Sequence, residues 1–217
     1  MRAWMSWSSG KDSAWALHRL RAEGVDVVGL MTTVNTTHDR VAMHAVRRGL
    51  LQAQAAAVGL PLIEVPLPWP CPNEAYEAAM ADALSRAVSD GVEAIAFGDL
   101  FLEDIRRYRE AQLAPMGLHP LFPLWGEPTP ALARTLVTAG VRAVITAVDP
   151  RQAPASLAGR AWEDAIGSLP PGVDPCGENG EFHTFVWDGP MLARPVPVQV
   201  GEVVTRDGFV FADVLPA

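Results

Sequence analysis

Residues 2–34 read RAWMSWSSGKDSAWALHRLRAEGVDVVGLMTTV, and this stretch decides the fold class. The apolar run 2–7 ends in a turn of small residues, and 12–23 then carries apolar residues at helical spacing. Gly24 closes the predicted helix. The next segment, 25–34, is nearly all apolar or β-branched, as in a strand buried on both faces of a parallel sheet. The stretch therefore predicts a β-α-β unit.

The alternation of helix and strand continues over more than half of the chain. Adjacent parallel strands need long crossover connections, which the intervening helices supply. The sequence therefore predicts an α/β fold with a doubly wound parallel sheet. Further helices are predicted over 41–58, 73–89, 102–114 and 129–139, and further strands over 61–67, 92–97 and 141–148.

Prolines interrupt this alternation after Asp149. Near the end, 198–205 and 209–215 form a predicted hairpin, joined at an Asp-Gly pair that favours tight reversal. We therefore expect an α/β domain over 1–150 and a small C-terminal lobe over 151–217 that packs on the sheet.

The composition is that of a globular enzyme. The 217 residues are 49% apolar, which is enough for a full core. No apolar run approaches the roughly 20 residues that span a bilayer, and the N-terminus is too short for a signal-peptide core. We expect a cytoplasmic protein with no membrane partner. Cys71 and Cys176 belong to no C-x-x-C pair, which favours reduced thiols over a metal knuckle or a redox pair.

The charge balance bears on the partners of the protein. The net charge is -8, from 25 acidic and 17 basic residues, and no basic block is visible. This average field repels a polyanion such as tRNA. A nucleic acid partner is therefore not expected, and a homodimer is left open.

Ser8-Ser9-Gly10-Lys11-Asp12-Ser13 joins the first predicted strand to the first predicted helix, at the edge where α/β sheets bind ligands. Its small residues let backbone N–H groups approach phosphate oxygens, and the helix N-terminus adds unsatisfied N–H groups and a positive dipole end. Lys11 can neutralise phosphate charge, while Asp12 can hold Mg²⁺ or cap the helix. The alternative is a Ser/Asp-rich helix cap with no ligand. The Walker A and Rossmann patterns are absent.

A second group of reactive side chains lies in 176–184, CGENGEFHT, and is followed by DGP. Glu178 or Glu181 can act as a base or bind an amine. His183 can transfer protons or bind phosphate, and Asn179 can orient a carbonyl. This density of reactive groups between glycines favours a substrate site. The alternative is an exposed turn beside an ordinary strand.

The segment 8–13 resembles the loop SGGxDS of the PP-loop ATP pyrophosphatase family, which recognises the pyrophosphate end of ATP. Ser9 stands where that motif usually has glycine, which keeps a small residue but restricts the backbone angles. GENGEFHT with DGP resembles the signature of the diphthine ammonia ligase branch of that family and is more specific than the loop. The resemblance implies the adenine nucleotide alpha hydrolase-like (HUP) form of the fold, with nucleotide binding in 1–150 and substrate binding in 151–217.

Further matches to that branch lie between the two motifs. Met43-His44 resembles its Met-Phe-His segment with residues missing, and FGDL at 97–100 resembles its Gly-Asp-Ile turn. Arg109 falls where the branch has an arginine after that turn. Each match has an ordinary alternative: His44 as a surface or core histidine, Asp99 as a helix cap, and Arg109 as a solvated side chain.

The resemblance implies an ATP-dependent, amide-forming ligase. A substrate carboxylate attacks the α-phosphate, pyrophosphate leaves, and ammonia displaces AMP from the acyl-adenylate. The implied cofactors are ATP and Mg²⁺, with Asp12 on the metal, and the implied partners are an adenine nucleotide, ammonia and a carboxylate acceptor, either a protein or a small metabolite. The expected catalytic residues are Lys11, Asp12, Glu178, Glu181 and His183. The expected nucleotide-binding residues are Ser8, Ser9, Gly10, Lys11, Asp12, Ser13, Met31, Thr32, His44, Gly98 and Asp99. The expected substrate-binding residues are Arg109, Gly177, Glu178, Asn179, Gly180, Glu181 and Thr184.

Three other functions stay open on the sequence. The first is a sensor that binds an adenine nucleotide without turning it over, and the second is a nucleotide hydrolase without ligase activity. The third is a tRNA-modifying PP-loop enzyme, which the acidic balance and the missing C-x-x-C pairs disfavour.

Overall fold

The computed structural model describes residues 1–41 and 44–217, and their strands form two sheets. The first sheet has the order β4-β2-β1-β5-β6, and every pair in this row is parallel. A short sixth strand, β3, pairs antiparallel with the last residues of β2. The strands are β1 (Arg2–Ser6), β2 (Asp26–Asn35), β3 (Arg40–Val41), β4 (Leu62–Leu67), β5 (Ala94–Ala96) and β6 (His119–Leu121).

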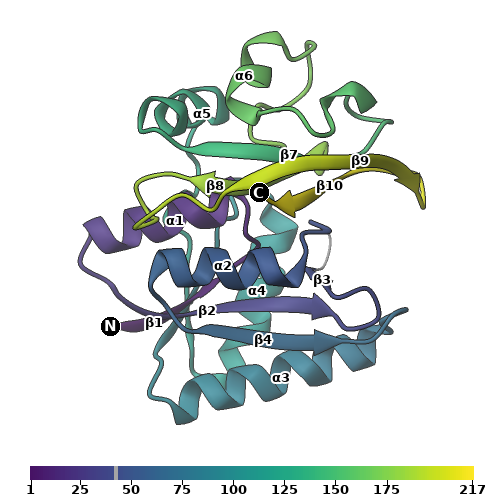
Figure 1. Cartoon of the computed structure of the whole chain (residues 1–217). Helices are drawn as coiled ribbons and strands as arrows, with labels where there is room; N and C mark the ends of the chain where they lie inside the picture. The colour runs from purple at the N-terminus through teal and green to yellow at the C-terminus, as the bar shows by residue number, and fades with distance from the viewer. Residues whose placement is uncertain (42–43) are drawn as a thin grey trace.

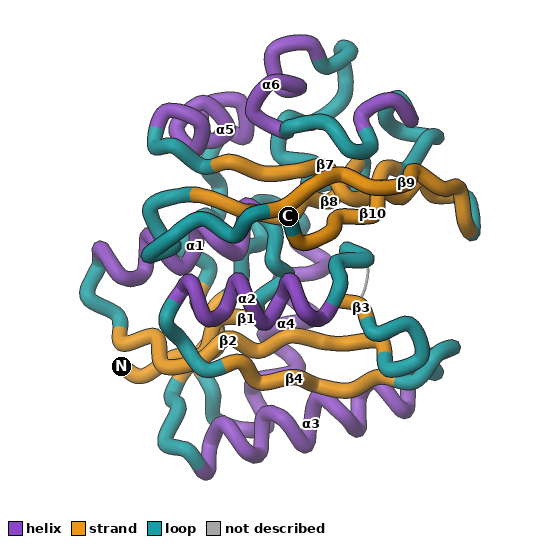
Figure 2. The backbone as a smooth tube through the Cα atoms, in the orientation of Figure 1, coloured by secondary structure: helices purple, strands orange, loops and turns teal. Residues whose placement is uncertain are grey.

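Helices cover both faces of this sheet, which confirms the predicted α/β doubly wound class. The helices are α1 (Lys11–Ala22), α2 (Arg48–Val58), α3 (Asn73–Ser89) and α4 (Glu103–Leu113), and a 3-10 turn (Ala114–Met116) follows α4. Figures 1 and 2 show α1 and α2 between the two sheets and α3 on the opposite face of the first. Neighbouring strand residues alternate between the two cores: Met5 packs with α1 and α2, and Trp4 packs with α3.

The second sheet is antiparallel, in the order β8-β7-β10-β9. Its outer face is covered by α5 and α6, as Figure 1 shows. The elements are α5 (Thr129–Thr138), β7 (Arg142–Val148), α6 (Trp162–Ala165), β8 (Phe182–Asp188), β9 (Val198–Arg206) and β10 (Phe209–Pro216), with 3-10 turns at Ala155–Leu157 and Ile166–Ser168.

The expectation that 141–148 continues the parallel sheet is wrong, because β7 pairs antiparallel with β8 and β10. All but the first residue of β7 are buried. Its sequence is therefore an apolar run like that of a central parallel strand, and such a run does not show whether the neighbouring strands are parallel or antiparallel. The change of architecture thus comes before Arg142. The division of the chain at residue 150 stays a prediction.

Most predicted element boundaries agree with the structure to within two residues. The helix predicted over 41–58 is an exception, because Val41 belongs to β3 and α2 begins at Arg48, after an extended residue. The predicted hairpin is confirmed: Asp207 and Gly208 both have positive φ (51° and 82°), as a tight two-residue turn requires. None of the helices in the described parts of the chain combines the length and hydropathy that crossing a membrane would need.

Candidate active site

A cavity of about 610 Å³ opens where β1, β2 and β5 of the first sheet meet the start of β8 in the second. Most of the residues predicted for the site line it, and they come from both ends of the sequence. Ser9, Gly10, Asn179 and Glu181 lie outside the lining. The predicted residues that line it are Ser8, Lys11, Asp12, Ser13, Met31, Thr32, His44, Gly98, Asp99, Arg109, Gly177, Glu178, Gly180, His183 and Thr184.

The phosphate loop 8–13 is fastened to the C-terminal sheet through its backbone. The Ser9 carbonyl oxygen accepts hydrogen bonds from the Val186 N–H and from Gln54 Nε2, each at 3.0 Å. Ser9 has φ 67°, a left-handed conformation that costs a side-chain-bearing residue about 1 kcal/mol. Position 9 therefore has a backbone conformation that glycine adopts freely and serine does not.

The first turn of α1 is open toward the cavity. Its N-cap residue is Gly10, which has no side chain to satisfy the first N–H groups of the helix. Thr184 Oγ1 accepts a bond from the Lys11 N–H at 3.2 Å, and Ser8 Oγ lies 3.0 Å from Ser13 Oγ. The alternative prediction, a helix capped by a Ser or Asp side chain, is therefore not observed at the N-cap of α1.

Lys11 and Asp12 form a buried ion pair at the floor of the cavity, with Lys11 Nζ 2.8 Å from Asp12 Oδ2. Lys11 Nζ also donates to the Cys176 carbonyl oxygen, so the pair joins the two motifs directly. Burial lowers the pKa of Lys11, but the Asp12 carboxylate together with Cys176 and Glu178 outweighs this effect, and the net shift of the pKa is upward. Burial raises the pKa of Asp12, and Lys11 opposes it. Asp12 Oδ1 is buried and has no hydrogen-bond partner among residues 1–41 and 44–217.

Gly98 lets the loop after β5 lie directly on α1. A Cβ at Gly98 would be 2.8 Å from the Ser13 nitrogen, so no larger residue fits. This contact brings Asp99 to the cavity, where its Oδ2 lies 3.7 Å from Arg109 Nε. Arg109 in turn lies 4.8 Å over the ring of Phe97. Asp99 does not cap α4, whose N-cap residue is Leu102, and Arg109 is largely buried rather than solvated.

Glu178 is the titratable group best suited to proton transfer. Its Oε1 accepts a bond of 2.7 Å from the Leu100 N–H, and its carboxyl group lines the cavity. Burial raises the pKa of Glu178 to about 7, with a further upward contribution from Asp12 and Asp99 that the Leu100 bond opposes. The group is therefore divided between its acid and base forms near neutral pH.

His44 and His183 lie side by side in the wall of the cavity, with ring centroids 4.6 Å apart. His44 Nδ1 is 3.1 Å from the Thr184 carbonyl oxygen. Burial lowers the pKa of His44 to about 3 and that of His183 to about 4, so both rings are neutral at physiological pH. Met43, predicted with His44, lies outside the described residues.

Glu181 and Asn179 hold the loop together rather than face the cavity. Glu181 is buried, and its carboxylate accepts bonds from the Asp174 N–H (3.1 Å), the Asn179 N–H (2.9 Å) and Asn179 Nδ2 (3.0 Å). With both oxygens occupied, the carboxylate has little capacity left for a substrate amine. The expected catalytic role of Glu181 and substrate role of Asn179 therefore lack support from their positions.

Gln54 is a residue of the site that the sequence did not reveal. It is fully buried in α2, donates from Nε2 to the carbonyl oxygens of Ser9 (3.0 Å) and Val186 (2.6 Å), and accepts from Trp7 Nε1 (2.8 Å). The only signal was a polar residue on the apolar face of a helix, in phase with Leu50 and Leu51.

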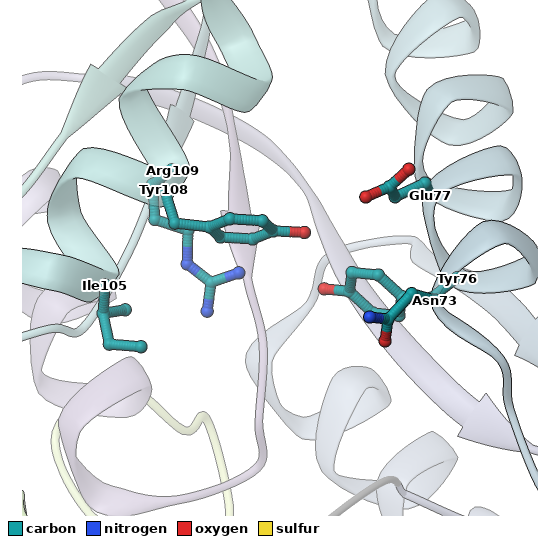
Figure 3. Close-up of a pocket in the computed structure, with 6 residues that line it drawn as sticks. All are labelled: Asn73, Tyr76, Glu77, Ile105, Tyr108 and Arg109. Carbon is teal, nitrogen blue, oxygen red and sulfur yellow. The ribbon is translucent and has the colours of Figure 1, made fainter.

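The cavity also extends between α3 and α4, which the sequence did not predict. A neighbouring cavity of about 390 Å³ shares Tyr76, Ile105 and Arg109 with it. In Figure 3 the Tyr108 hydroxyl points toward Tyr76, and the Arg109 guanidinium lies below the Tyr108 ring. The two helices thus contribute a wall of aromatic rings and one cation.

Fold and site together define an α/β protein in which a phosphate-type loop and a second polar loop face one cavity. Comparison with known families agrees: the diphthamide synthase N-terminal domain matches residues 1–120, and the diphthamide synthase C-terminal domain matches 129–211. The chain belongs to the diphthamide synthase family.

Curated relatives point the same way. The rat diphthine--ammonia ligase is 25% identical, over 95% of this chain and 86% of its own length. The zebrafish diphthine--ammonia ligase is 26% identical, over 95% of this chain and 90% of its own length. The solved structure of a predicted subunit of tRNA methyltransferase from Methanocaldococcus jannaschii covers 68% of this chain and 78% of that chain, with TM-score 0.43 and 17% identity, too little to indicate a shared function. The family and its ligases identify the chain as an ATP-dependent, amide-forming ligase, and nothing among these relatives favours a sensor or a hydrolase.

Proposed function

We propose that the protein joins ammonia to a carboxylate acceptor in two steps within this one cavity. A carboxylate oxygen attacks the α-phosphate of ATP and pyrophosphate leaves; ammonia then attacks the acyl carbon and AMP leaves with the attacking oxygen. The observation that carries the proposal is the bond from Lys11, in the phosphate loop, to Cys176, at the start of the second motif. It supports a single site in which nucleotide and acceptor meet.

The phosphate loop would hold the pyrophosphate end of ATP. Free N–H groups at the start of α1 and the ammonium group of Lys11 oppose the charge that develops on the leaving pyrophosphate. Met31 and Thr32 would contact the adenine end, where Met31 is part of the buried core against α3.

Mg²⁺ fits the same site as a companion of ATP. Within residues 1–41 and 44–217, no group of three or more His, Cys, Asp or Glu side chains forms a metal cage. Mg²⁺ needs no such cage, because it keeps several waters and binds through one or two carboxylates plus phosphate oxygens. Asp12, with its unpaired Oδ1, would supply the carboxylate.

Glu178 would remove the proton that ammonia loses as the amide forms, because its pKa of about 7 leaves part of the population ionised at neutral pH. Arg109, Gly177, Gly180 and Thr184 would bind the substrate, and neutral His183, next to Thr184 on β8, would orient it. Glu181 and Asn179 would act by positioning this loop.

The acceptor and the assembly complete the proposal. The named relatives act on diphthine, and for this chain we propose a carboxylate acceptor without assigning it to a protein. We further propose a cytoplasmic enzyme and a homodimer, for which light scattering should give twice the chain mass of 23.3 kDa.

The test of the proposed function is separation of AMP from ADP after incubation with ATP, Mg²⁺, ammonium chloride and a panel of carboxylic acids. We expect AMP and pyrophosphate in equal amounts, dependent on the acid. AMP or ADP formed at the same rate without any acid would instead support a hydrolase. Nucleotide binding with no product across the panel would support a sensor.

A further inference from the structure

A second cavity, of about 370 Å³, adjoins the nucleotide cavity on the side of the β9–β10 hairpin. Its walls come from the ends of β2 and β4 and from the hairpin, and the surface is mostly apolar. Trp69, Phe209 and Phe211 contribute aromatic rings to the lining, which also includes Val204. A concave, mainly apolar space of this size is typical of a small-molecule site.

Two of the charged side chains that line this second cavity, Arg40 and Asp213, are paired with each other. Asp213 forms ion pairs with Arg40 at 3.0 Å and with Arg47 at 2.5 Å, and Arg40 also donates to the Ala45 carbonyl oxygen at 2.7 Å. Arg206 and Asp207 lie at the exposed turn of the hairpin. Away from this turn the charged side chains that line the cavity are paired, and the mostly apolar surface favours an apolar group.

The two cavities meet at His183, Val41 and Leu67, which line both. His183 stands one residue before Thr184, whose hydroxyl accepts the Lys11 N–H of the phosphate loop. A molecule with its body in the second cavity therefore presents one end to the reacting end of the nucleotide. That end meets the polar groups of the nucleotide cavity, while the body lies against a mostly apolar surface.

We propose that the second cavity binds the apolar body of the acceptor, so that the substrate class is a small hydrophobic carboxylic acid whose carboxylate passes His183 to reach the α-phosphate. This inference rests on the proposed function. The adenine ring does not need this space, because the nucleotide cavity has an apolar wall of its own in Met31, Met80 and Phe97.

Two neighbouring valines on β9 provide a matched pair of variants. Val204 lines the cavity and pairs with Phe211 across the hairpin, whereas Val203, 49% exposed, points to the opposite face of the strand. V204W fills the cavity, and V203W adds the same side chain outside it. Neither residue belongs to the nucleotide cavity.

The experiment is calorimetric titration with 3-phenylpropionate, with acetate as a probe that lacks the apolar body. The native protein and V203W should bind 3-phenylpropionate alike, and V204W should bind it at least about tenfold more weakly. Acetate should bind weakly to all three. The α,β-methylene analogue of ATP should bind equally to all three proteins.

The outcomes separate the subsite from the reaction. Equal loss of 3-phenylpropionate binding in both variants, no binding to the native protein, or loss of the nucleotide analogue in V204W would overturn the subsite. Binding lost only in V204W, with no AMP formed from any acid, would support the subsite and overturn the proposed function. If circular dichroism shows that V204W does not fold, F211A, which removes one aromatic wall, should weaken 3-phenylpropionate binding in the same assay.

Discussion

The phosphate loop at 8–13 and the polar loop at 174–184 face the same cavity but are built in different ways. The first presents backbone N–H groups from the start of a helix and is fastened from outside, through the Ser9 carbonyl oxygen. The second is fastened from inside, because Glu181 and Asp174 accept the N–H groups of their own loop. The first loop depends on the conformation of its backbone. In the second loop some carboxylates hold the loop together, and others are left to face the cavity.

The largest expected effect comes from Asp12, where the first loop uses a side chain. D12N removes a negative charge beside Lys11 and the oxygen proposed for Mg²⁺, and AMP formation should fall about 100-fold or more while the fold persists. AMP release and circular dichroism are the measurements. D104N, at an exposed carboxylate of α4, is the control and should keep full activity. Unchanged AMP formation in D12N would remove Asp12 from the mechanism.

Q54L removes the hydrogen bond from the Gln54 side chain to the Ser9 carbonyl oxygen of the first loop. The variant removes one of the two hydrogen bonds to the Ser9 carbonyl oxygen, removes the Gln54 bond to the Val186 carbonyl oxygen, and takes away the Gln54 partner of the Trp7 indole N–H. These losses should cost about 2 to 3 kcal/mol of unfolding free energy. The KM for ATP should rise about tenfold, because the loop loses its position. Urea denaturation and steady-state kinetics measure the two effects. Q52L, on the exposed side of the same helix, should change neither, and a Q54L protein with native KM would show that Gln54 does not position the loop.

The second loop predicts that its two glutamates behave differently. We expect kcat/KM of the native enzyme to rise through pH 7, and E178Q should remove that rise, since the ionised Glu178 is the proposed base. E181Q should lower stability by about 1 to 2 kcal/mol and keep that pH profile. Deprotonation of ammonium to ammonia adds a separate rise at higher pH in every variant. A pH profile lost in E181Q and kept in E178Q would reverse the two roles.

Glu178 also predicts how stability depends on pH. The folded protein holds this proton up to about pH 7, whereas the unfolded chain releases it near the ordinary value of 4.5. Between these values the native state binds more protons, so this contribution to stability is present below pH 4.5 and is lost as pH rises to 7. As pH rises from 4.5 to 7, the urea midpoint of E178Q should therefore increase relative to that of the native protein. A constant difference would contradict the raised pKa.

The smallest expected effect is at Ser9. S9G relieves a left-handed serine and removes a buried hydroxyl that has no partner, partly offset by the greater freedom of glycine when unfolded. The protein should gain about 1 kcal/mol in urea denaturation. S8G, which deletes a hydroxyl bonded to Ser13, should lose stability instead, and a destabilised S9G would show that the serine is not strained.

The first loop and most of the fold could be predicted from the sequence, because apolar residues at helical spacing, turn residues and a run of small residues are properties of short segments. The sequence could not show that β7 belongs to the antiparallel sheet, since a buried strand has the same apolar pattern in parallel and antiparallel sheets. It also could not separate Glu178 from Glu181, two residues of one type three positions apart. Their roles depend on whether the backbone turns each toward the cavity or toward Asp174 and Asn179. Gln54 was missed for a similar reason, because its partners lie far away in sequence.

The central claim is that a carboxylate held by the second loop attacks the α-phosphate held by the first. The most direct test uses an acceptor acid labelled with oxygen-18 in its carboxylate, with ATP, Mg²⁺ and ammonium, and mass spectrometry of the AMP formed. The account predicts one labelled oxygen in each AMP, transferred from the acid. Unlabelled AMP would contradict it, and so would AMP that takes up oxygen-18 when the water, and not the acid, carries the label.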